Sequence, residues 1–122
     1  MLHLAFALCL CVDFSKLIPV AQSEAVMSGP MIREVLTGAT VVTPRAGKTT
    51  IRQVFYSDRR TRYDDGRESW GLWEVRGDLY CSQWPPSPSW VCYEMRQWTE
   101  DGAHWVVWIG DSGTRYEGFV ER

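Results

Sequence analysis

Residues 79–93 read LYCSQWPPSPSWVCY and predict a β-hairpin. Two aromatic halves flank a proline-rich centre at residues 85–88, which breaks the strand pattern. Cys81 and Cys92 stand at symmetric positions, so folding about this turn places their sulfur atoms opposite each other on neighbouring strands. We therefore expect a disulfide within the hairpin, and such a bond persists in an oxidising compartment.

Further strands are expected on both sides of this hairpin. Short runs of β-branched and aromatic residues alternate with Gly, Asp, Ser and Pro, which favour turns. About eight strands in sequential order predict an all-β fold, a small antiparallel meander or barrel. The expected strands cover residues 40–43, 49–57, 61–63, 69–75, 79–84, 89–98, 103–109 and 114–120.

The turns between the later strands fix which side chains share a face. Gly77-Asp78 and Asp101-Gly102 fit two-residue hairpin turns, and Gly113 fits the left-handed position of a three-residue loop. Because side chains alternate along a strand, these turns carry one register through the sheet. The face expected to form the core contains Trp73, Val75, Tyr80, Trp84, Val91, Tyr93, Met95, Val106, Trp108, Tyr116 and Val120.

The opposite face mixes charged and large apolar residues. Residues 105–109, WVVWI, lack polar alternation, a pattern typical of a strand that is covered on both faces. We expect a cover over this face: the segment 31–36, a second copy of the chain, or a ligand or partner. Contiguous exposed aromatic residues usually mark an interaction surface. The residues predicted to bind are Trp90, Trp98, Trp105, Val107 and Ile109.

The N-terminal residues 1–25 resemble an export signal. Their apolar run is too short to span a bilayer, and cleavage is expected after Ser23 or Ala25. An uncleaved membrane anchor is the alternative. Residues 26–36 are expected to lead into the domain, with 31–36 as one short helical turn, and residues 37–122 to form the β domain. The predicted location is periplasmic or extracellular, or membrane-anchored and facing the periplasm.

A family resemblance agrees with this interpretation. Residues 71–81, GLWEVRGDLYC, follow an aromatic strand VFY at 54–56 and precede Cys92. This succession resembles small exported alphaproteobacterial proteins that carry a β-rich domain of unknown function. The resemblance covers nearly all of residues 37–122 and implies export and a disulfide-bonded β fold. It implies no activity, and the tip at 85–88 and the additional Trp residues depart from the family pattern.

Composition argues against several function classes. The formal net charge is −2, and the Arg residues lie between acids, so nucleic acid is a poor partner. The run Gly47-Lys48-Thr49 lacks the upstream glycine of a phosphate-binding loop, because Val42 stands there. No metal-ligand set is expected, since Cys81 and Cys92 pair and only His104 remains beyond the leader. Arg76-Gly77-Asp78 is interpreted as a turn, not as an adhesion motif.

These observations predict a binding or assembly module that docks a protein partner or a second copy through its Trp-rich face. The chain is not expected to be an enzyme or to need a cofactor. One alternative is a small-ligand carrier with a hollow barrel interior. Another is a small hydrolase that uses His104 with neighbouring acids. In the carrier the interior would lie among Trp73, Tyr80, Trp84, Tyr93 and Trp108.

Overall fold

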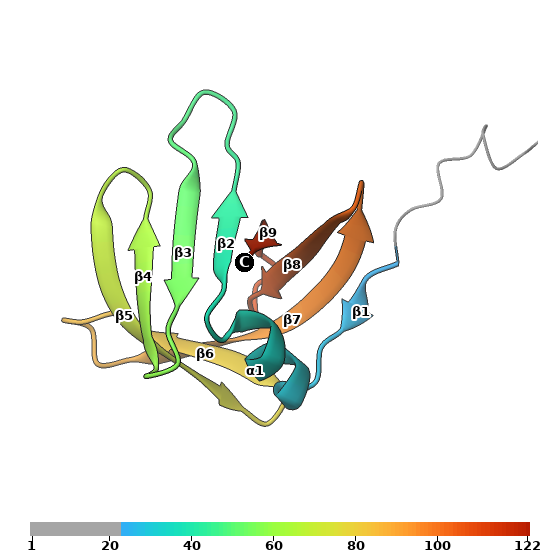
Figure 1. Cartoon of the computed structure of the whole chain (residues 1–122). Coiled ribbons are helices and arrows are strands. Elements are labelled where there is room, and N and C mark those ends of the chain that lie inside the picture. Colours follow the sequence, from blue (N-terminus) through green and yellow to red (C-terminus); the bar gives the residue numbers. More distant parts are fainter. Residues whose placement is uncertain (1–22) are drawn as a thin grey trace, which may run out of the picture.

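The protein is a closed antiparallel barrel of eight strands, described here by a computed structural model for residues 23–122. The predicted leader lies outside the described residues except for its last three. Figure 1 shows the strands curving around a common axis, with a helix at one end. The elements are β1 (Ala25–Val26), α1 (Gly29–Leu36), β2 (Thr40–Thr43), β3 (Ile51–Phe55), β4 (Arg60–Asp64), β5 (Glu68–Arg76), β6 (Leu79–Gln83), β7 (Trp90–Glu100), β8 (Ala103–Ile109) and β9 (Arg115–Glu121).

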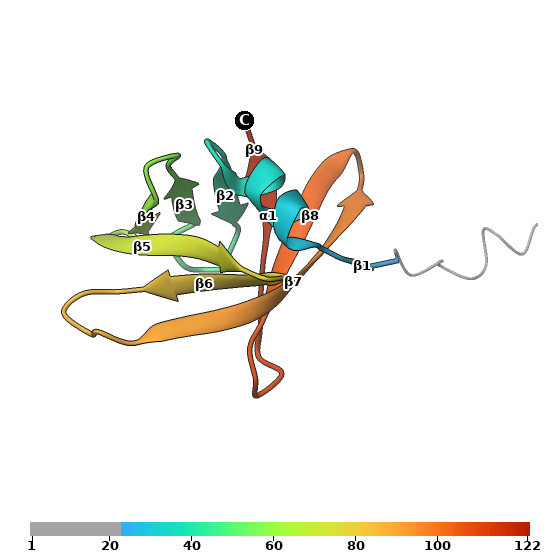
Figure 2. The same ribbon diagram turned by 90° about the horizontal axis from the view of Figure 1, so that it is seen from below.

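Each strand from β2 to β9 pairs with the next one along the chain, and β9 returns to pair with β2. The long strand β7 makes this closure possible, because its first half pairs with β6 and its second half with β8. The two-residue strand β1 lies along the second half of β7 on its other side (Figure 2). The predicted fold class is confirmed.

The turn residues adopt the backbone conformations that their types favour. Asp101 and Gly102 both have positive φ, at 50° and 77°, as a two-residue turn between twisted strands requires. Gly113 has φ of 82° in the loop between β8 and β9. The register predicted from these turns holds across the sheet, since Tyr80 pairs with Tyr93 and Met95 with Trp108.

Helix α1 plugs one end of the barrel. Ser28 caps its N-terminus, with Oγ accepting from the Met31 N–H, and Pro30 occupies the first turn, where its missing N–H costs nothing. Ile32, Val35 and Leu36 follow at helical spacing and are all buried in the core. The helix therefore covers the barrel end and not the outer face of β8, so the expectation that 31–36 covers that face is wrong.

Contacts at both ends hold α1 in this position. The backbone N–H of Gly29 donates to the Asp78 carboxylate at 2.7 Å, in the turn between β5 and β6. A Cβ at position 29 would lie 2.1 Å from the Gly77 carbonyl oxygen, so only glycine fits there. At the other end, the Arg122 guanidinium donates to the carbonyl oxygens of Glu34 and Val35. The positive charge near the helix C-terminus and the negative charge near its N-terminus both suit the helix dipole.

An aromatic layer crosses the barrel directly above the helix. The fully buried ring of Phe55 packs edge-on against Trp73 at 5.6 Å and Tyr80 at 5.9 Å, and stacks on Trp108 at 6.0 Å. Trp73 and Trp108 are buried as predicted. Three other residues placed in the core by the sequence are not part of it. Trp84 is only partly buried and lies outside the core cluster. Val91 is 50% exposed and Tyr116 is 56% exposed, because both belong to strand ends beyond the layer.

The predicted disulfide joins Cys81 and Cys92, which are direct cross-strand partners on β6 and β7. It lies on the outer face of the barrel, because Tyr80 and Tyr93 beside it face inward. Nearby, the Arg76 guanidinium stacks 4.8 Å from the Trp90 ring. The outer surface of this hairpin is thus held by a covalent bond and a cation–π contact.

Replacing Asp78 with Ala tests the attachment of the helix. The Gly29 N–H would lose its carboxylate partner, so we expect the free energy of unfolding to fall by about 1 kcal/mol. Urea denaturation measures the change. Asp111→Ala, in the exposed turn after β8, is the control, and an equal effect there would contradict the capping role.

Replacing both Cys81 and Cys92 with Ser tests the disulfide. Loss of the cross-link frees a short loop in the unfolded chain, so we expect about 2–3 kcal/mol less stability. Urea denaturation of the double variant and of the reduced wild-type protein should give matching midpoints. Two free thiols in the intact mass of protein isolated without reductant would show that the bond does not form.

Candidate functional site

The other end of the barrel, opposite α1, opens into a cavity of about 760 Å³. Its lining includes residues of β2, β3, β4 and β5, and the loops that join β2 to β3 and β4 to β5 rise together in Figure 1. Tyr80 and Trp108 of the aromatic layer contribute to its walls. The other lining residues are Val41, Thr43, Arg45, Ile51, Gln53, Tyr63, Ser69, Trp70, Ser82, Trp84, Pro85, Tyr93, Arg115, Tyr116 and Glu117.

Two inward-facing glycines shape this half of the barrel. A Cβ at Gly71 would meet the Trp84 ring at 2.7 Å, so the absence of a side chain on β5 lets that indole lie flat over the strand. A Cβ at Gly118 would meet Val41 at 2.6 Å, which allows β9 to approach β2 closely. Glycine inside a strand often marks such a close approach. Here it places an aromatic wall beside the cavity.

Aromatic residues hold one another in place around the cavity. Tyr63 packs edge-on against Trp84 at 6.0 Å, and Tyr93 against Tyr116 at 6.2 Å. The Trp84 indole N–H donates to Ser82 Oγ at 3.2 Å, which fixes the plane of the ring. The walls are therefore set before any ligand enters.

Three tyrosine hydroxyl groups of the cavity are neutral. Burial raises the pKa of Tyr80 far above its usual value, while the neighbouring Ser82 and Gln53 side chains act in the opposite direction. Burial is also the main cause that raises the pKa values of Tyr63 and Tyr93. Phenolic groups in these environments donate and accept hydrogen bonds but carry no charge at neutral pH.

Two polar groups of the cavity wall lack a partner: the Trp108 indole N–H lacks a hydrogen-bond acceptor, and the Arg45 guanidinium lacks an acidic partner among residues 23–122. The Trp108 side chain is 8% exposed, and its indole N–H has no hydrogen-bond partner among residues 23–122. Arg45 lies in the β2–β3 loop at the mouth, where its Nε donates to the Thr49 carbonyl oxygen at 2.8 Å. The described part of the chain offers the Arg45 guanidinium no ion pair.

The structure brings four of the five predicted binding residues together on the outer face of β7 and β8. Trp98, Trp105 and Phe119 form one aromatic row across β7, β8 and β9, with ring centroids 6.1 and 5.5 Å apart. Ile109 and Val107 follow along β8 on the same face. Trp98, Trp105 and Ile109 are half-buried, and Val107 is completely buried.

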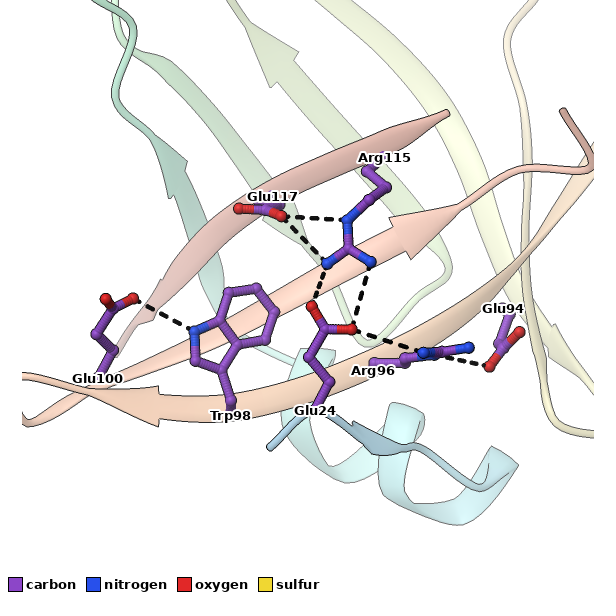
Figure 3. Close-up of polar contacts among 7 residues, drawn as sticks. All are labelled: Glu24, Glu94, Arg96, Trp98, Glu100, Arg115 and Glu117. Atoms are coloured by element: carbon purple, nitrogen blue, oxygen red, sulfur yellow. Dashed lines mark hydrogen bonds and ion pairs between the residues drawn. The ribbon is translucent and has the colours of Figure 1, made fainter. Parts of the chain in front are cut away.

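An ion bridge spans β8 next to Val107. The Glu24 carboxylate accepts from Arg115 on β9 and lies 3.6 Å from Arg96 on β7 (Figure 3). Arg96 and Glu117 are the cross-strand partners of Val107, so these charged side chains flank it on both sides. The cover predicted for this face thus comes from side chains of the chain itself, including Glu24 just before β1.

The fifth predicted residue lies elsewhere. Trp90 is eight residues before Trp98 on β7, about 26 Å away along the strand. It packs with Arg76 beside the disulfide instead. The five residues therefore do not form one surface.

The contacts of His104 and of two acids in the β4–β5 turn are local. His104 contacts Gln97 at 2.8 Å, and burial lowers the pKa of its imidazole. Asp64 and Asp65 accept from the backbone N–H groups of Gly66 and Arg67, which accounts for these acids as turn residues. Among residues 23–122, no group of three His, Cys, Asp or Glu side chains is arranged to hold a metal ion.

Comparisons with protein-family models, curated proteins and solved structures found no match. The family resemblance of the sequence stays a prediction. In the part of the chain that is described, no helix has the length and apolar character to cross a membrane. Functional inference therefore rests on the cavity and the surface.

Sequence reasoning identified part of the cavity wall. Of the five residues expected around a hollow interior, Tyr80, Trp84, Tyr93 and Trp108 line the cavity. Trp73 instead belongs to the packed layer below it. Sequence reasoning missed the wall formed by β2, β3 and β4, because the register was not carried through the turns before β5. Alternation along residues 51–55 would have shown Ile51, Gln53 and Phe55 on one face.

The ion bridge predicts a pH-dependent contribution to stability. The hydrogen bond from Arg115 lowers the pKa of Glu24, helped by the charges of Arg115 and Arg96. A lowered folded-state pKa stabilises the protein above the unfolded value of about 4.3 and loses this effect as pH falls through the folded value. At neutral pH, we expect Glu24→Gln to unfold more easily by at most about 1 kcal/mol, because exposed pairs contribute little.

Thermal unfolding of wild type and Glu24→Gln across the acid range measures this difference. The two unfolding temperatures should converge as the pH falls below about 4. Glu34→Gln, an exposed acid on α1, is the control and should match wild type throughout. A Glu24→Gln difference that persists unchanged at low pH would show that the bridge is not its cause.

Proposed function

We propose that this protein is a binding protein that holds a small, largely apolar ligand inside its barrel. The cavity of about 760 Å³ carries this proposal. Ligand pockets commonly have volumes of about 300–1,000 Å³, with mostly apolar and aromatic walls and a few polar groups. The open half of this barrel has that composition, and its mouth leads directly to solvent.

The contrast between the two halves of the barrel supports this proposal. Protein interiors are normally close-packed, and empty apolar space costs stability. Below Phe55, the core follows that rule, with Ile32, Leu36 and Met95 completely buried. Above it, seven aromatic residues and Gln53 surround open space. A domain this small gains from filling its interior, so a hollow half is best explained by a ligand.

The outer aromatic row has less support as a docking surface. A partner that seats on Val107 would need that side chain accessible, but it is completely buried in the single chain. The row formed by Trp98, Trp105 and Phe119 is half-buried and its members pack against one another. A hydrolase is supported still less, since Gln97 is the side-chain partner of His104.

We also propose export, with cleavage after Ser23. The hairpin disulfide is consistent with an oxidising compartment. Cleavage after Ser23 would keep Glu24 and Ala25, which form the ion bridge and pair with β7. Cleavage after Ala25 would remove both. N-terminal sequencing of protein secreted by its native cell decides between these sites.

Binding of the neutral fluorescent probe N-phenyl-1-naphthylamine tests the cavity. We expect emission to rise and to saturate at one probe per protein. Ser69, at the mouth, shares the inward face of β5 with Gly71 and Trp73. Ser69→Phe should weaken probe binding about tenfold or more, because the added ring occupies the entrance.

Leu72 supplies the matched control, because it points to the opposite face of β5 and does not line the cavity. Leu72→Phe places an aromatic ring outside the barrel and should leave probe affinity unchanged. Circular dichroism checks that both variants are folded. No probe binding, or equal binding by wild type and Ser69→Phe, would contradict a ligand site in the cavity.

A further inference from the structure

The charged residues at the cavity mouth indicate which kind of ligand the cavity holds. This inference rests on the proposed function of the cavity as a ligand site. Two cations, Arg45 and Arg115, and one acid, Glu117, line the cavity. Arg115 is neutralised by Glu24 and Glu117. Arg45 forms no such pair within residues 23–122, so its charge remains available at the mouth.

The position of Arg45 is fixed by its surroundings. Its Nε–H is engaged by the Thr49 carbonyl oxygen at 2.8 Å across the β2–β3 loop. The guanidinium still has four N–H groups in a planar fork, which suits a carboxylate. The side chain is half-buried, and a partly desolvated cation attracts an anion more strongly than an exposed one.

Asp65, in the β4–β5 turn, does not pair with Arg45. Burial is the main cause that raises the pKa of Tyr63; the charge of Asp65 adds to this effect and the charge of Arg45 opposes it. The Asp65 carboxylate accepts from the Arg67 backbone N–H at 3.2 Å and makes no ion pair with Arg45. An acidic ligand would meet Arg45 without displacing a partner.

A second observation lies in the aromatic layer at the base of the cavity. The Trp108 indole N–H is buried and lacks an acceptor among the described residues. Buried donors in native proteins are nearly always paired, because an unmet donor costs stability. Because this nitrogen is itself buried, it meets an oxygen or nitrogen atom of a ligand only when the side chains of the aromatic layer shift on binding.

We propose that the ligand is a planar aromatic acid, with its carboxylate on Arg45 and its ring among Trp84, Tyr93 and Tyr80. Flat rings suit walls made of tyrosine and tryptophan, through stacked and edge-on contacts. The neutral hydroxyls of Tyr63 and Tyr93 add hydrogen-bond donors along the wall and no repelling charge. The acid end faces solvent at the mouth, and the ring end faces the layer around Phe55.

Competition between two matched compounds tests whether the cavity prefers a ligand that carries a carboxylate. 2-Naphthoate and 2-naphthamide have the same ring system, but the first carries a charged carboxylate where the second carries a neutral amide. Each displaces N-phenyl-1-naphthylamine from the wild-type protein, and we expect the naphthoate to bind about tenfold tighter, because a charge-assisted pair exceeds a neutral hydrogen bond. High salt should reduce this preference.

Variants in the β2–β3 loop assign the preference to one side chain. Arg45→Gln should bring the two affinities close to equality. Lys48→Gln removes the same charge from the same loop at a residue that does not line the cavity, and it should keep the wild-type ratio. Equal affinities in wild type, an unchanged ratio in Arg45→Gln, or no displacement by either compound would overturn the inference.

The two proposals fail in different ways. The neutral probe can bind to wild type and be blocked by Ser69→Phe while naphthoate binds no tighter than naphthamide. In that case the ligand site is supported, and the proposal that the ligand is an aromatic acid is wrong. If the neutral probe does not bind, or binds equally to Ser69→Phe, the ligand site itself is wrong, and the inference about the acid falls with it.

Discussion

The aromatic packing around Phe55 is the constraint on which the rest of this barrel depends. Eight strands enclose a space that short side chains cannot fill, and the contents of that space decide the shape of the protein. Phe55, Trp73, Tyr80 and Trp108 meet in one layer and divide the interior. On one side of the layer, α1 completes a packed core. On the other side, the walls stay apart, and a cavity remains.

The helix and the hairpins depend on one another through this division. Asp78 holds the start of α1, and the backbone of Gly77 leaves no room there for any residue but Gly29. The tripeptide Arg76-Gly77-Asp78 thus has a structural role that its letters alone do not reveal. Its aspartate satisfies a helix N–H that would otherwise lose its partner on burial. The turn that joins β5 and β6 also caps the helix.

The sequence allowed the later half of the barrel to be predicted in detail, because its turns are short and chemically specific. Asp101-Gly102 and Gly113 fix the register from β7 to β9, and the Cys81–Cys92 pair fixes it between β6 and β7. The early half has no equally specific turn, so the inward position of Phe55 was not found. The sequence correctly placed the Val91 side chain on the inward face of its strand but wrongly placed it in the buried core. Alternation along a strand shows which face a side chain is on, but not where the strand extends beyond the barrel.

The functional surface was harder to predict for a related reason. A strand without polar alternation, such as residues 105–109, indicates burial on both faces but not what provides it. Here Glu24, from outside the predicted β domain, bridges Arg96 and Arg115 next to the strand. An acid that precedes the first strand leaves no periodic signal. The cavity was easier to anticipate as a possibility, because inward Tyr and Trp residues gather on β6, β7 and β8.

The pairing of β2 with β9 sets the order in which this molecule can fold. Thr40 pairs with Glu121, so the barrel closes only when nearly the whole chain is present. Arg122 adds the last contact to α1. Contacts between distant parts of a sequence slow folding, and the nascent chain stays open until its final strand is available. For an exported protein that crosses a membrane before it folds, this delay is an advantage, because the N-terminal part cannot close into a barrel during transit.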